Sequence, residues 1–478
     1  MNQTKTKYFI QTLAIMVLSV IAFVLLKPFL PEKLFPENGT ALKNIVVDSL
    51  MLEALATEAD VENILPADSS QIPLANPVVP AENSIVFTEN QYVGYEHLIS
   101  FFKKLYELEK TNQGNVRIAY FGDSMNDGDM IVQDFRSNFQ DRFGGNGVGF
   151  VNISSESSAS RGTVKHQHSK NWKTYSFVNT KSYYSPFGIS GNVFFANDTS
   201  AAYWVNFEAS YFKHLTQLAK PTLFYGKSHN KNGQIVIIKD KDTVYKTLNT
   251  DQLLNELPLA DSGKKLKIQF KNVDSIPFYG VDFENAPGVY VDNFSNRGNS
   301  GLPLTSLSPA MLGAFNAKLH YDLIILQYGT NVLGSGSKSF TWYENRMKRV
   351  VAHLRSAMPN TAILVISVAD KSKKYDAQMQ TDSAVYPLIK AQLNYAKQSE
   401  SGFINLFDLM GGKGSMVKWV DDEPSKANKD YTHFNYRGSK LVADLIYDKI
   451  MLGYTDFVKQ HSKNIAVKSD SLSVTSRQ

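Results

Sequence analysis

The sequence predicts an α/β fold: a doubly wound parallel-sheet domain, interrupted by an all-β, sandwich-like insert and preceded by an N-terminal membrane helix. Three observations predict it. Apolar strands at residues 116–121 and 321–328 each run into a glycine-containing loop, and a helical pattern follows the first of them, as in parallel α/β sheets. Between residues 151 and 284 the pattern changes to short alternating runs separated by turn residues. Residues 8–26 contain no charge and are about as long as a membrane-crossing helix.

Composition indicates a globular protein. The chain has 478 residues, 43% of them hydrophobic, so it can bury at least one large core. Its formal net charge of +5 is small for this length, and its lysines are scattered among acids, so no positive stripe indicates a nucleic-acid partner. The absence of cysteine excludes structural disulfides, thiolate catalysis and zinc–thiolate sites, and it leaves the redox compartment open.

Residues 1–30 are predicted to be a transmembrane or signal-anchor segment. Lys5 and Lys7 precede the apolar stretch, and Lys27 closes it without the small-x-small site of a cleavable signal peptide. We therefore expect an uncleaved anchor, with the large domain exported to the periplasm or another extracytoplasmic space. Charge balance across the helix supports this orientation only weakly. Residues 31–86 are rich in proline and are expected to form an extended linker.

The first candidate site residue is Ser124. The strand at 116–121 runs directly into Gly122-Asp123-Ser124, which places Ser124 at the carboxyl end of the strand, where open α/β sheets bind ligands. The following helix, 128–142, would point its N-terminus toward this position and favour developing negative charge there. Because Gly-Asp-Ser is also a common turn sequence, a role as nucleophile depends on partners elsewhere in the chain.

Two further loops could donate hydrogen bonds to an oxyanion. The strand at 321–328 ends near Gly329-Thr330-Asn331, and the Asn331 amide would lie beside Ser124 if the two strands are neighbours. Its alternative role is to cap a turn. A strand at 289–292 leads to a second loop, in which a glycine would let the backbone approach a ligand and present an N–H. Gly298 is the predicted donor, with Gly301 as the near alternative.

A base and its orienting carboxylate are predicted near the end of the chain. Asp430 precedes His433 by three residues, so a tight turn could let the carboxylate hold Nδ1–H while Nε2 faces Ser124. The helix at 437–451 would keep both on a rigid edge. The alternative is a surface turn or a core histidine packed among its aromatic neighbours, Tyr431, Phe434 and Tyr436.

The order Gly-Asp-Ser, isolated Gly, Gly-x-Asn and Asp-x-x-His resembles the four blocks of the SGNH/GDSL hydrolase family. The resemblance covers about residues 116–150 and 287–451. It implies that Ser124, Asp430 and His433 form a catalytic triad, and that Ser124 N–H, Gly298 N–H and the Asn331 side chain form the oxyanion hole. More loosely, the chain resembles the exported branch that deacetylates O-acetylated peptidoglycan or related polysaccharides, in which a β insert follows Phe143-Gly144-Gly145-x-Gly147-x-Gly149-Phe150.

One segment departs from a simple match. Gly188-Ile189-Ser190-Gly191 also resembles the signature of the family's second block, inside the predicted insert. Gly298 is preferred because it precedes a helix and then the strand that leads to Asn331, as a doubly wound order requires. If Gly191 is the donor instead, the insert starts after it and the predicted boundary is wrong.

The predicted domains are a discontinuous hydrolase domain at 87–150 and 285–456, the β insert at 151–284 and a polar tail at 457–478, expected to be disordered. The insert could be a carbohydrate-binding module. Aromatic side chains there could stack on sugars, although aromatics at strand spacing are more often core: Tyr183, Tyr184, Trp204 and Tyr211. His166 and His168 could form a metal pair, but no third ligand is evident, so the pair stays unassigned.

The expected function is an exported serine esterase that removes O-acetyl groups from an envelope polysaccharide such as peptidoglycan. It would use an acyl-serine intermediate and need no metal or organic cofactor. A polysaccharide O-acetyltransferase with the same triad is the alternative, since a sugar hydroxyl can resolve the same intermediate. The second alternative is a non-catalytic, membrane-tethered glycan-binding protein. The expected partners are the acetylated glycan, the membrane through the N-terminal helix, and a membrane acyltransferase that could work alongside.

Overall fold

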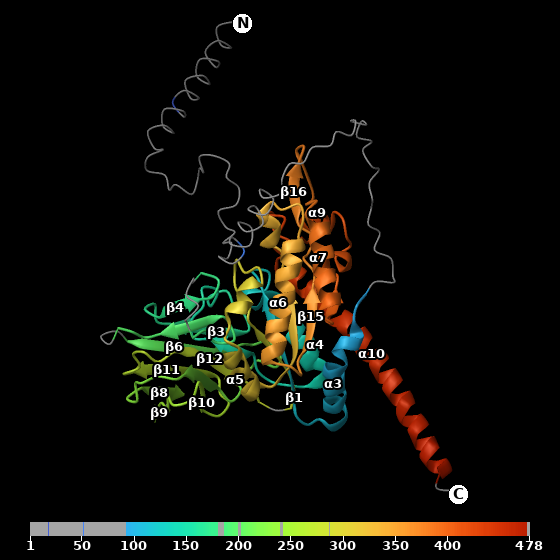
Figure 1. Cartoon of the computed structure of the whole chain (residues 1–478). Helices are drawn as coiled ribbons and strands as arrows, with labels where there is room; N and C mark the ends of the chain where they lie inside the picture. Colours follow the sequence, from blue (N-terminus) through green and yellow to red (C-terminus); the bar gives the residue numbers. More distant parts are fainter. Residues whose placement is uncertain are drawn as a thin grey trace, which may run out of the picture. The chain divides into compact units, whose positions relative to one another are not determined.

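The computed structural model describes residues 18, 51, 92–179, 186–198, 202–239, 242–285 and 287–475, with side chains described as far as residue 462. The chain divides into two units, Met1–Ile45 and Val46–Gln478, and all elements below lie in the second (Figure 1). The predicted membrane segment and linker fall outside the described residues, apart from Leu18 and Met51. In the described part of the chain, no helix combines the length and the apolar character needed to cross a bilayer.

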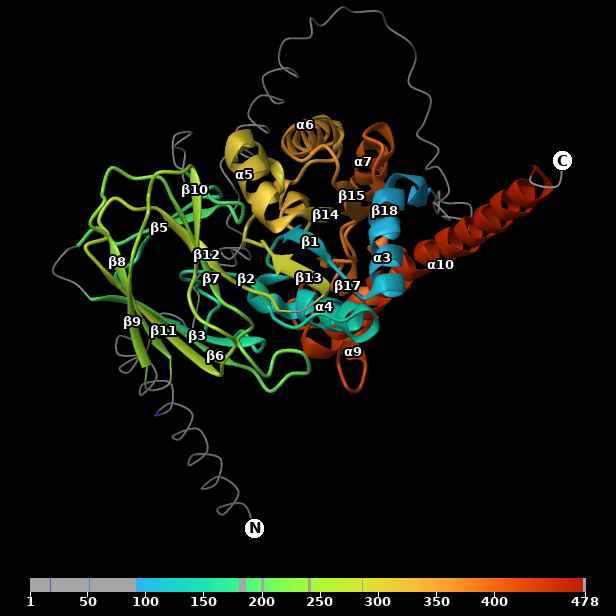
Figure 2. The ribbon, with the colours of Figure 1, turned by 90° about the horizontal axis from the view of Figure 1, so that it is seen from below.

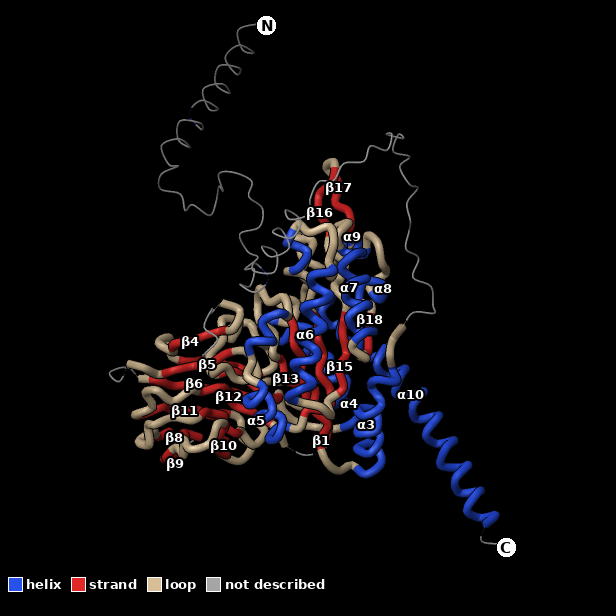
Figure 3. The backbone as a smooth tube through the Cα atoms, in the orientation of Figure 1, coloured by secondary structure: helices blue, strands red, loops and turns tan. Residues whose placement is uncertain are grey.

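Five parallel strands form the central sheet of the described chain (Figure 3). All neighbouring strands in it pair in parallel. In sheet order they are β13 (Gly288–Asn293), β1 (Asn115–Gly122), β14 (Tyr321–Gln327), β15 (Ala362–Ile366) and β18 (Gly402–Ile404). By chain order this is 2-1-3-4-5, a doubly wound arrangement whose switch point, where such sheets bind ligands, lies between β1 and β14.

Helices cover both faces of this sheet (Figure 2). On β1, Ala119 and Phe121 pack in the core on one face, and Ile118 and Tyr120 in the core on the other. The first face is covered by α5 (Pro309–Leu319), α6 (Thr341–Ala357) and α7 (Val385–Gln398). The second is covered by α3 (Ile99–Thr111), α4 (Met130–Phe143) and α10 (Tyr436–Thr475). Because successive strand residues point to opposite faces, strands covered on both sides are largely apolar, as residues 118–121 of β1 are.

Short elements complete the parallel-sheet domain. The 3-10 helices are η3 (Tyr95–Leu98), η4 (Asp127–Asp129), η5 (Leu302–Ser306) and η6 (Val332–Ser335). Two short α-helices, α8 (Leu406–Leu409) and α9 (Ser415–Asp421), precede α10. Strands β16 (Ser372–Tyr375) and β17 (Gln378–Thr381) form an antiparallel hairpin after β15.

The insert consists of two antiparallel sheets. In one, the path is β10 (Leu254–Pro258), β7 (Thr222–Gly226), β12 (Phe278–Phe283), β5 (Asn192–Phe195) and β4 (Lys173–Ser176), with β2 (Gly149–Asn152) paired to β12. The other has β3 (Val164–His168), β6 (Tyr203–Ala209), β11 (Lys265–Lys271), β8 (Gln234–Lys239) and β9 (Asp242–Thr247). Side chains of both sheets share one core, for instance Val205 and Phe207 with Phe278 and Val281. This is the packing of a β-sandwich.

A buried ionic cluster joins the insert to the parallel sheet. Arg117 on β1 is 2% exposed, and its Nε donates to Asp292 Oδ2 on β13 at 2.7 Å. The same guanidinium pairs with Asp282 on β12 and with Glu284. One cation thus holds three carboxylates where the two domains meet.

The C-terminal prediction is wrong over most of its length. The helix predicted at 437–451 is α10, which continues to Thr475, so residues 457–475 are helical and do not form a disordered tail. Aromatic side chains of this helix pack against α3. The ring centroids of Phe457 and Phe102 lie 6.1 Å apart, and those of His461 and Tyr106 lie 5.1 Å apart. No proline interrupts the segment.

Candidate active site

Ser124 lies in a tight turn at the end of β1. The Asn126 N–H donates to the Asp123 carbonyl at 3.2 Å and closes the turn. A Cβ on Gly122 would lie 2.6 Å from Asn126 Nδ2 and 2.9 Å from Ser295 Oγ, so a larger residue there would displace these side chains. The turn presents Ser124 beside the carboxyl edge of the sheet, as predicted from the strand pattern.

The structure brings Ser124, His433 and Asp430 into one hydrogen-bonded chain. Ser124 Oγ lies 2.9 Å from His433 Nε2, and His433 Nδ1 lies 2.7 Å from Asp430 Oδ2. The N–H groups of Thr432 and His433 both donate to Asp430 Oδ1 at 3.0 Å. The side chains of His433 and Asp430 are 38% and 50% exposed. A substrate could therefore reach a serine whose proton faces an imidazole nitrogen.

The loop that carries His433 precedes α10 and is fixed from two sides. Within the loop, the Asn428 N–H donates to the His433 carbonyl at 2.8 Å. From outside it, the Ser372 N–H after β15 donates to the Tyr431 carbonyl at 3.0 Å. The imidazole position therefore depends on the sheet as well as on the helix.

Two carboxylates near Ser124 have shifted pKa values in opposite directions. Burial alone would raise the pKa of Asp430, but hydrogen bonds from the His433 ring and from the His433 and Thr432 N–H groups lower it to about 2. Asp430 is therefore ionised wherever His433 can act as a base. Burial raises the pKa of Asp123 to about 6, against the lowering effect of the Met125 N–H, which donates to its Oδ1 at 3.0 Å.

Asn331 and Gly298 lie at the ends of the strands that flank β1. Asn331 follows β14, is 4% exposed and donates through Nδ2 to the Asn299 carbonyl at 3.1 Å. The loop after β13 forms a turn in which the Asn299 N–H donates to Asn296 O at 3.3 Å. Gly298, its third residue, has a φ of 75°, which a type II turn requires and glycine adopts without strain. The candidate oxyanion donors and Ser124 thus follow three adjacent parallel strands.

The two alternative glycines have their N–H groups engaged. The Gly301 N–H donates to Asn299 Oδ1 at 2.9 Å, and the Gly191 N–H donates to Gly188 O at 2.9 Å. Among the described residues, no acceptor faces the Gly298 N–H. The geometry therefore favours Gly298 over both alternatives.

The Gly191 segment nevertheless lies against the Gly298 loop. Asn192 Nδ2 donates to Asn296 Oδ1 at 3.0 Å, and Asn296 Nδ2 donates to the Ser190 carbonyl at 3.0 Å. The segment at residues 188–191 is thus adjacent to the candidate oxyanion loop.

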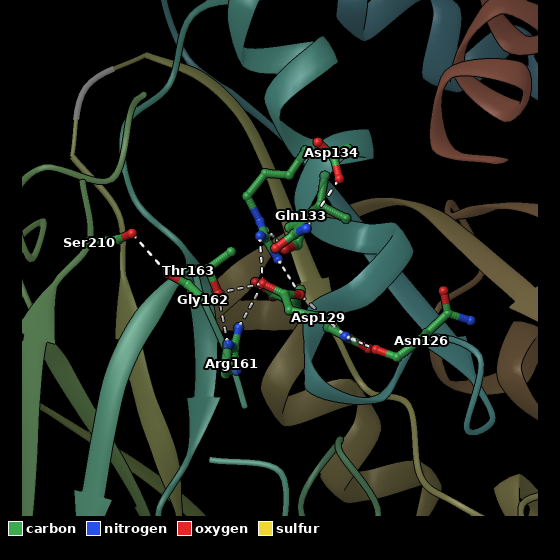
Figure 4. Close-up of polar contacts among 12 residues, drawn as sticks. Asn126, Asp129, Gln133, Asp134, Arg161, Gly162, Thr163 and Ser210 are labelled. Carbon is green, nitrogen blue, oxygen red and sulfur yellow. Dashed lines mark hydrogen bonds and ion pairs between the residues drawn. The ribbon is translucent and has the colours of Figure 1, made fainter. Parts of the chain in front are cut away.

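Sequence reasoning missed an ionic network around Asp129, which follows Ser124 by five residues in the sequence (Figure 4). Asp129 is buried, with a φ of 71°, and its carboxylate accepts two hydrogen bonds from Arg136, at 2.9 and 3.1 Å. Arg161 Nη2 and Thr163 Oγ1, both from the insert, lie 3.2 and 2.7 Å from Asp129 Oδ2. Burial alone would raise the pKa of Asp129, but the charges of Arg136 and Arg161 outweigh it and hold that pKa well below its usual range.

This network corrects the helix predicted at 128–142, because α4 begins at Met130, after the left-handed Gly128 and Asp129. The insert loop, residues 155–163, also contacts Asp127, whose Oδ1 accepts from the Ser157 hydroxyl at 2.8 Å. Hydrogen bonds from insert residues thus hold the backbone that follows the nucleophile turn in place. Acidic residues at 127 and 129 are the sequence signal that could have suggested such partners.

The remaining candidates of the insert lie apart from this chemistry. His166 is buried, its ring stacks 4.8 Å from that of Phe207, and burial lowers its pKa to about 3, so it is a core residue. Within the described ranges, no group of three or more potential ligands could hold a metal with His168 or elsewhere. Trp204 is half-buried with Lys267 over its ring, and Tyr211 is 85% exposed. Tyr183 and Tyr184 lie outside the described residues.

Comparisons with known proteins agree with this fold. Residues 272–441 match the GDSL-like Lipase/Acylhydrolase family, a stretch that includes Gly298, Asn331, Asp430 and His433 but not Ser124. A solved structure titled as a peptidoglycan O-acetylesterase in action is similar at 20% identity and a TM-score of 0.61, covering 75% of this chain and 96% of that chain.

A family two carbohydrate esterase from Cellvibrio japonicus matches at 10% identity and a TM-score of 0.26, over 62% of this chain and 99% of that chain. No curated protein sequence matches this chain. The family match does not include Ser124, but in the fold the end of β1 places Ser124 next to His433, which the match does include. Residues 272–441 are therefore similar to the GDSL-like Lipase/Acylhydrolase family, and this match together with the serine–histidine–aspartate geometry indicates a hydrolase of the esterase type.

Proposed function

We propose that the protein is a serine esterase that removes O-acetyl groups from a cell-envelope polysaccharide such as peptidoglycan. The observation that carries the proposal is the 2.9 Å contact between Ser124 Oγ and His433 Nε2, with Asp430 2.7 Å behind the imidazole. The fold shared with a peptidoglycan O-acetylesterase over 75% of this chain supports the substrate class. A β insert fastened to the nucleophile loop supports a polymeric substrate.

The arrangement performs acyl transfer in two steps. His433 Nε2 takes the Ser124 proton as Oγ attacks the acetyl carbonyl, and Asp430 stabilises the resulting imidazolium through Nδ1–H. The tetrahedral intermediate collapses, the sugar oxygen leaves with the proton from His433, and acetyl-Ser124 remains. Water then attacks with His433 as base, and acetate leaves from a regenerated serine.

The oxyanion of each tetrahedral intermediate would be bound by the N–H groups of Ser124 and Gly298 and by the Asn331 amide. Asn331 Nδ2 carries two hydrogens, and the Asn299 carbonyl takes one of them at 3.1 Å. The second remains for the oxyanion, in a direction fixed by the first. Donors held in place before the reaction stabilise the transition state without reorganisation.

We also propose that the domain is exported and anchored by the N-terminal helix. The uncharged stretch at 8–26 and the absence of a small-x-small site after it support this proposal. Protease treatment of intact cells, with the outer envelope permeabilised where one is present, should degrade the domain while cytoplasmic markers survive. Full protection would contradict export.

The decisive experiment for the activity uses the full-length chain with p-nitrophenyl acetate and with O-acetylated peptidoglycan. We expect acetate release from both, abolished in Ser124→Ala and in His433→Ala. Release from the small ester alone would leave an esterase with another substrate, and faster transfer to an added oligosaccharide would identify the acetyltransferase. Parental turnover in both variants would refute the triad.

A further inference from the structure

Three exposed aromatic side chains surround the insert loop. Tyr211, Phe212 and Tyr436 keep 85%, 37% and 57% of their surface exposed. The rings of Tyr211 and Phe212 stack 5.0 Å apart at an interplanar angle of 18°. Tyr436 begins α10, three residues after His433. Scattered exposed aromatics are ordinary, but aromatics gathered within a polar rim mark binding surfaces.

Contacts with the insert loop hold these rings in one region. The Tyr436 hydroxyl donates to the Ser160 carbonyl at 3.4 Å. The Ser210 hydroxyl donates to the Gly162 carbonyl at 2.8 Å, in the contact drawn in Figure 4. A Cβ on Gly162 would lie 3.1 Å from Phe212 Cε2, so the backbone of the insert loop packs closely under that ring. The parallel-sheet domain and the insert each supply part of the aromatic surface.

The same loop contacts the backbone that follows the nucleophile. Ser157 donates to Asp127, three residues after Ser124, and Arg161 and Thr163 bind Asp129. The aromatic surface is therefore connected to Ser124 through one loop and to His433 through the start of α10. A polymer bound at Ser124 would extend beyond the reacting sugar, and one loop contacts both the aromatic residues and the backbone that follows Ser124.

We propose that Tyr211, Phe212 and Tyr436 form a stacking subsite for a sugar ring of the same glycan chain that carries the ester. The proposal rests on the proposed function and deepens it. A pyranose presents an apolar C–H face, which matches an aromatic ring, and hydroxyls at its edge, which match a polar rim. Exposed polar side chains of the insert loop, such as Ser160, border the rings.

The test compares a polymeric substrate with an ester that is too small to contact both Ser124 and the aromatic side chains. In the full-length chain, Tyr211→Ala and Tyr436→Ala should each lower the ratio of kcat/KM for O-acetylated peptidoglycan to that for p-nitrophenyl acetate by about five-fold. The effect should lie mainly in KM, because the contact is remote from the reacting bond. Tyr211→Phe should keep the parental ratio. Tyr245→Ala is the matched control, since Tyr245 is 65% exposed on β9 of the insert.

A binding measurement separates this proposal from the esterase proposal. In a Ser124→Ala background, co-sedimentation with O-acetylated peptidoglycan should weaken with Tyr211→Ala and not with Tyr245→Ala, whether or not the parent hydrolyses the polymer. Equal binding and an unchanged ratio would overturn the subsite. Dissociation of an oligomer by Tyr211→Ala, with binding retained, would also overturn it and assign the surface to contact between copies of the chain.

Discussion

Arg117→Met should destabilise the protein far more than the loss of an ordinary surface ion pair. The Arg117 side chain is 2% exposed and pairs with Asp282 and Asp292, which are 4% and 0% exposed, as well as with the more open Glu284. Methionine can fill much of the same volume but leaves two buried carboxylates without their cation. Removing one partner of a buried ionic cluster typically lowers the free energy of unfolding by about 3–5 kcal/mol. In a domain of 150–250 residues, each kcal/mol lost lowers the Tm by roughly 2–4 °C.

We therefore expect a Tm loss of at least about 6 °C. The control is Arg142→Met, whose arginine is 40% exposed and pairs with Glu109 at 3.1 Å, and which should cost less than about 1 kcal/mol. Both variants can be compared with the parent by thermal and urea unfolding of the full chain. Equal losses in the two variants would refute the assignment of Arg117 as the cation that joins the domains.

The Arg117 defect should also grow with pH. Burial raises the pKa of Asp282, and the Arg117 charge opposes that rise. A raised pKa means that the folded state keeps a proton that the unfolded chain has lost, so stability falls as pH rises from the unfolded value toward the folded one. Without Arg117 the pKa of Asp282 should rise further, so the gap between variant and parent should be larger at pH 8 than at pH 5. A gap independent of pH would contradict this explanation.

Three other changes test the site. Asp430→Asn should lower kcat on p-nitrophenyl acetate by about 100- to 10,000-fold with little change in Tm, because the His433 tautomer and its cation lose their partner; a kcat within ten-fold of the parent would exclude Asp430 from the triad. Asn331→Ala should lower kcat by about 100- to 1,000-fold with a smaller change in KM, and a change confined to KM would refute an oxyanion role. Asp123→Asn should raise Tm at pH 7.5 but not at pH 4. Because the pKa of Asp123 in the folded parent is about 6, the parent loses up to about 3 kcal/mol of stability as the pH rises from about 4 to 6, and the asparagine variant does not. Equal changes in Tm at both pH values would contradict the buried-acid explanation.

The predictable part of this fold is the part encoded locally. Continuous apolar runs identify β1 and β14, because strands covered on both faces need no polar residues. A glycine-containing loop after each strand, together with the three-residue spacing of Asp430 and His433, then fixes which side chains can meet at the carboxyl edge. Once the order of the strands in the sheet is known, these features locate the site, and doubly wound sheets adopt few strand orders.

The unpredicted part depends on contacts between distant segments. Acidic residues at 127 and 129 are compatible with a helix N-terminus and the helix is predicted from residue 128, but α4 begins at Met130. Asp129 instead adopts a left-handed conformation, while its carboxylate binds Arg161 from another domain. Sequence spacing cannot reveal such a partner. The aromatic packing of Phe457 and His461 on α10 against α3 likewise joins segments more than 300 positions apart.

The way the insert joins the sheet explains why the active site tolerates it. The chain leaves the parallel-sheet domain through β2 and returns through β12, and these two strands pair with each other. β12 then leads into β13, which pairs with β1. The two ends of the insert therefore meet beside β1, which leads to Ser124, and β13, which leads to Gly298. The insert separates Ser124 and Gly298 widely in sequence, but β1 and β13 remain paired. The family match begins at residue 272, just before β12. Insertion at this junction also lets the insert contact the segment after the nucleophile directly, through Ser157, Arg161 and Thr163.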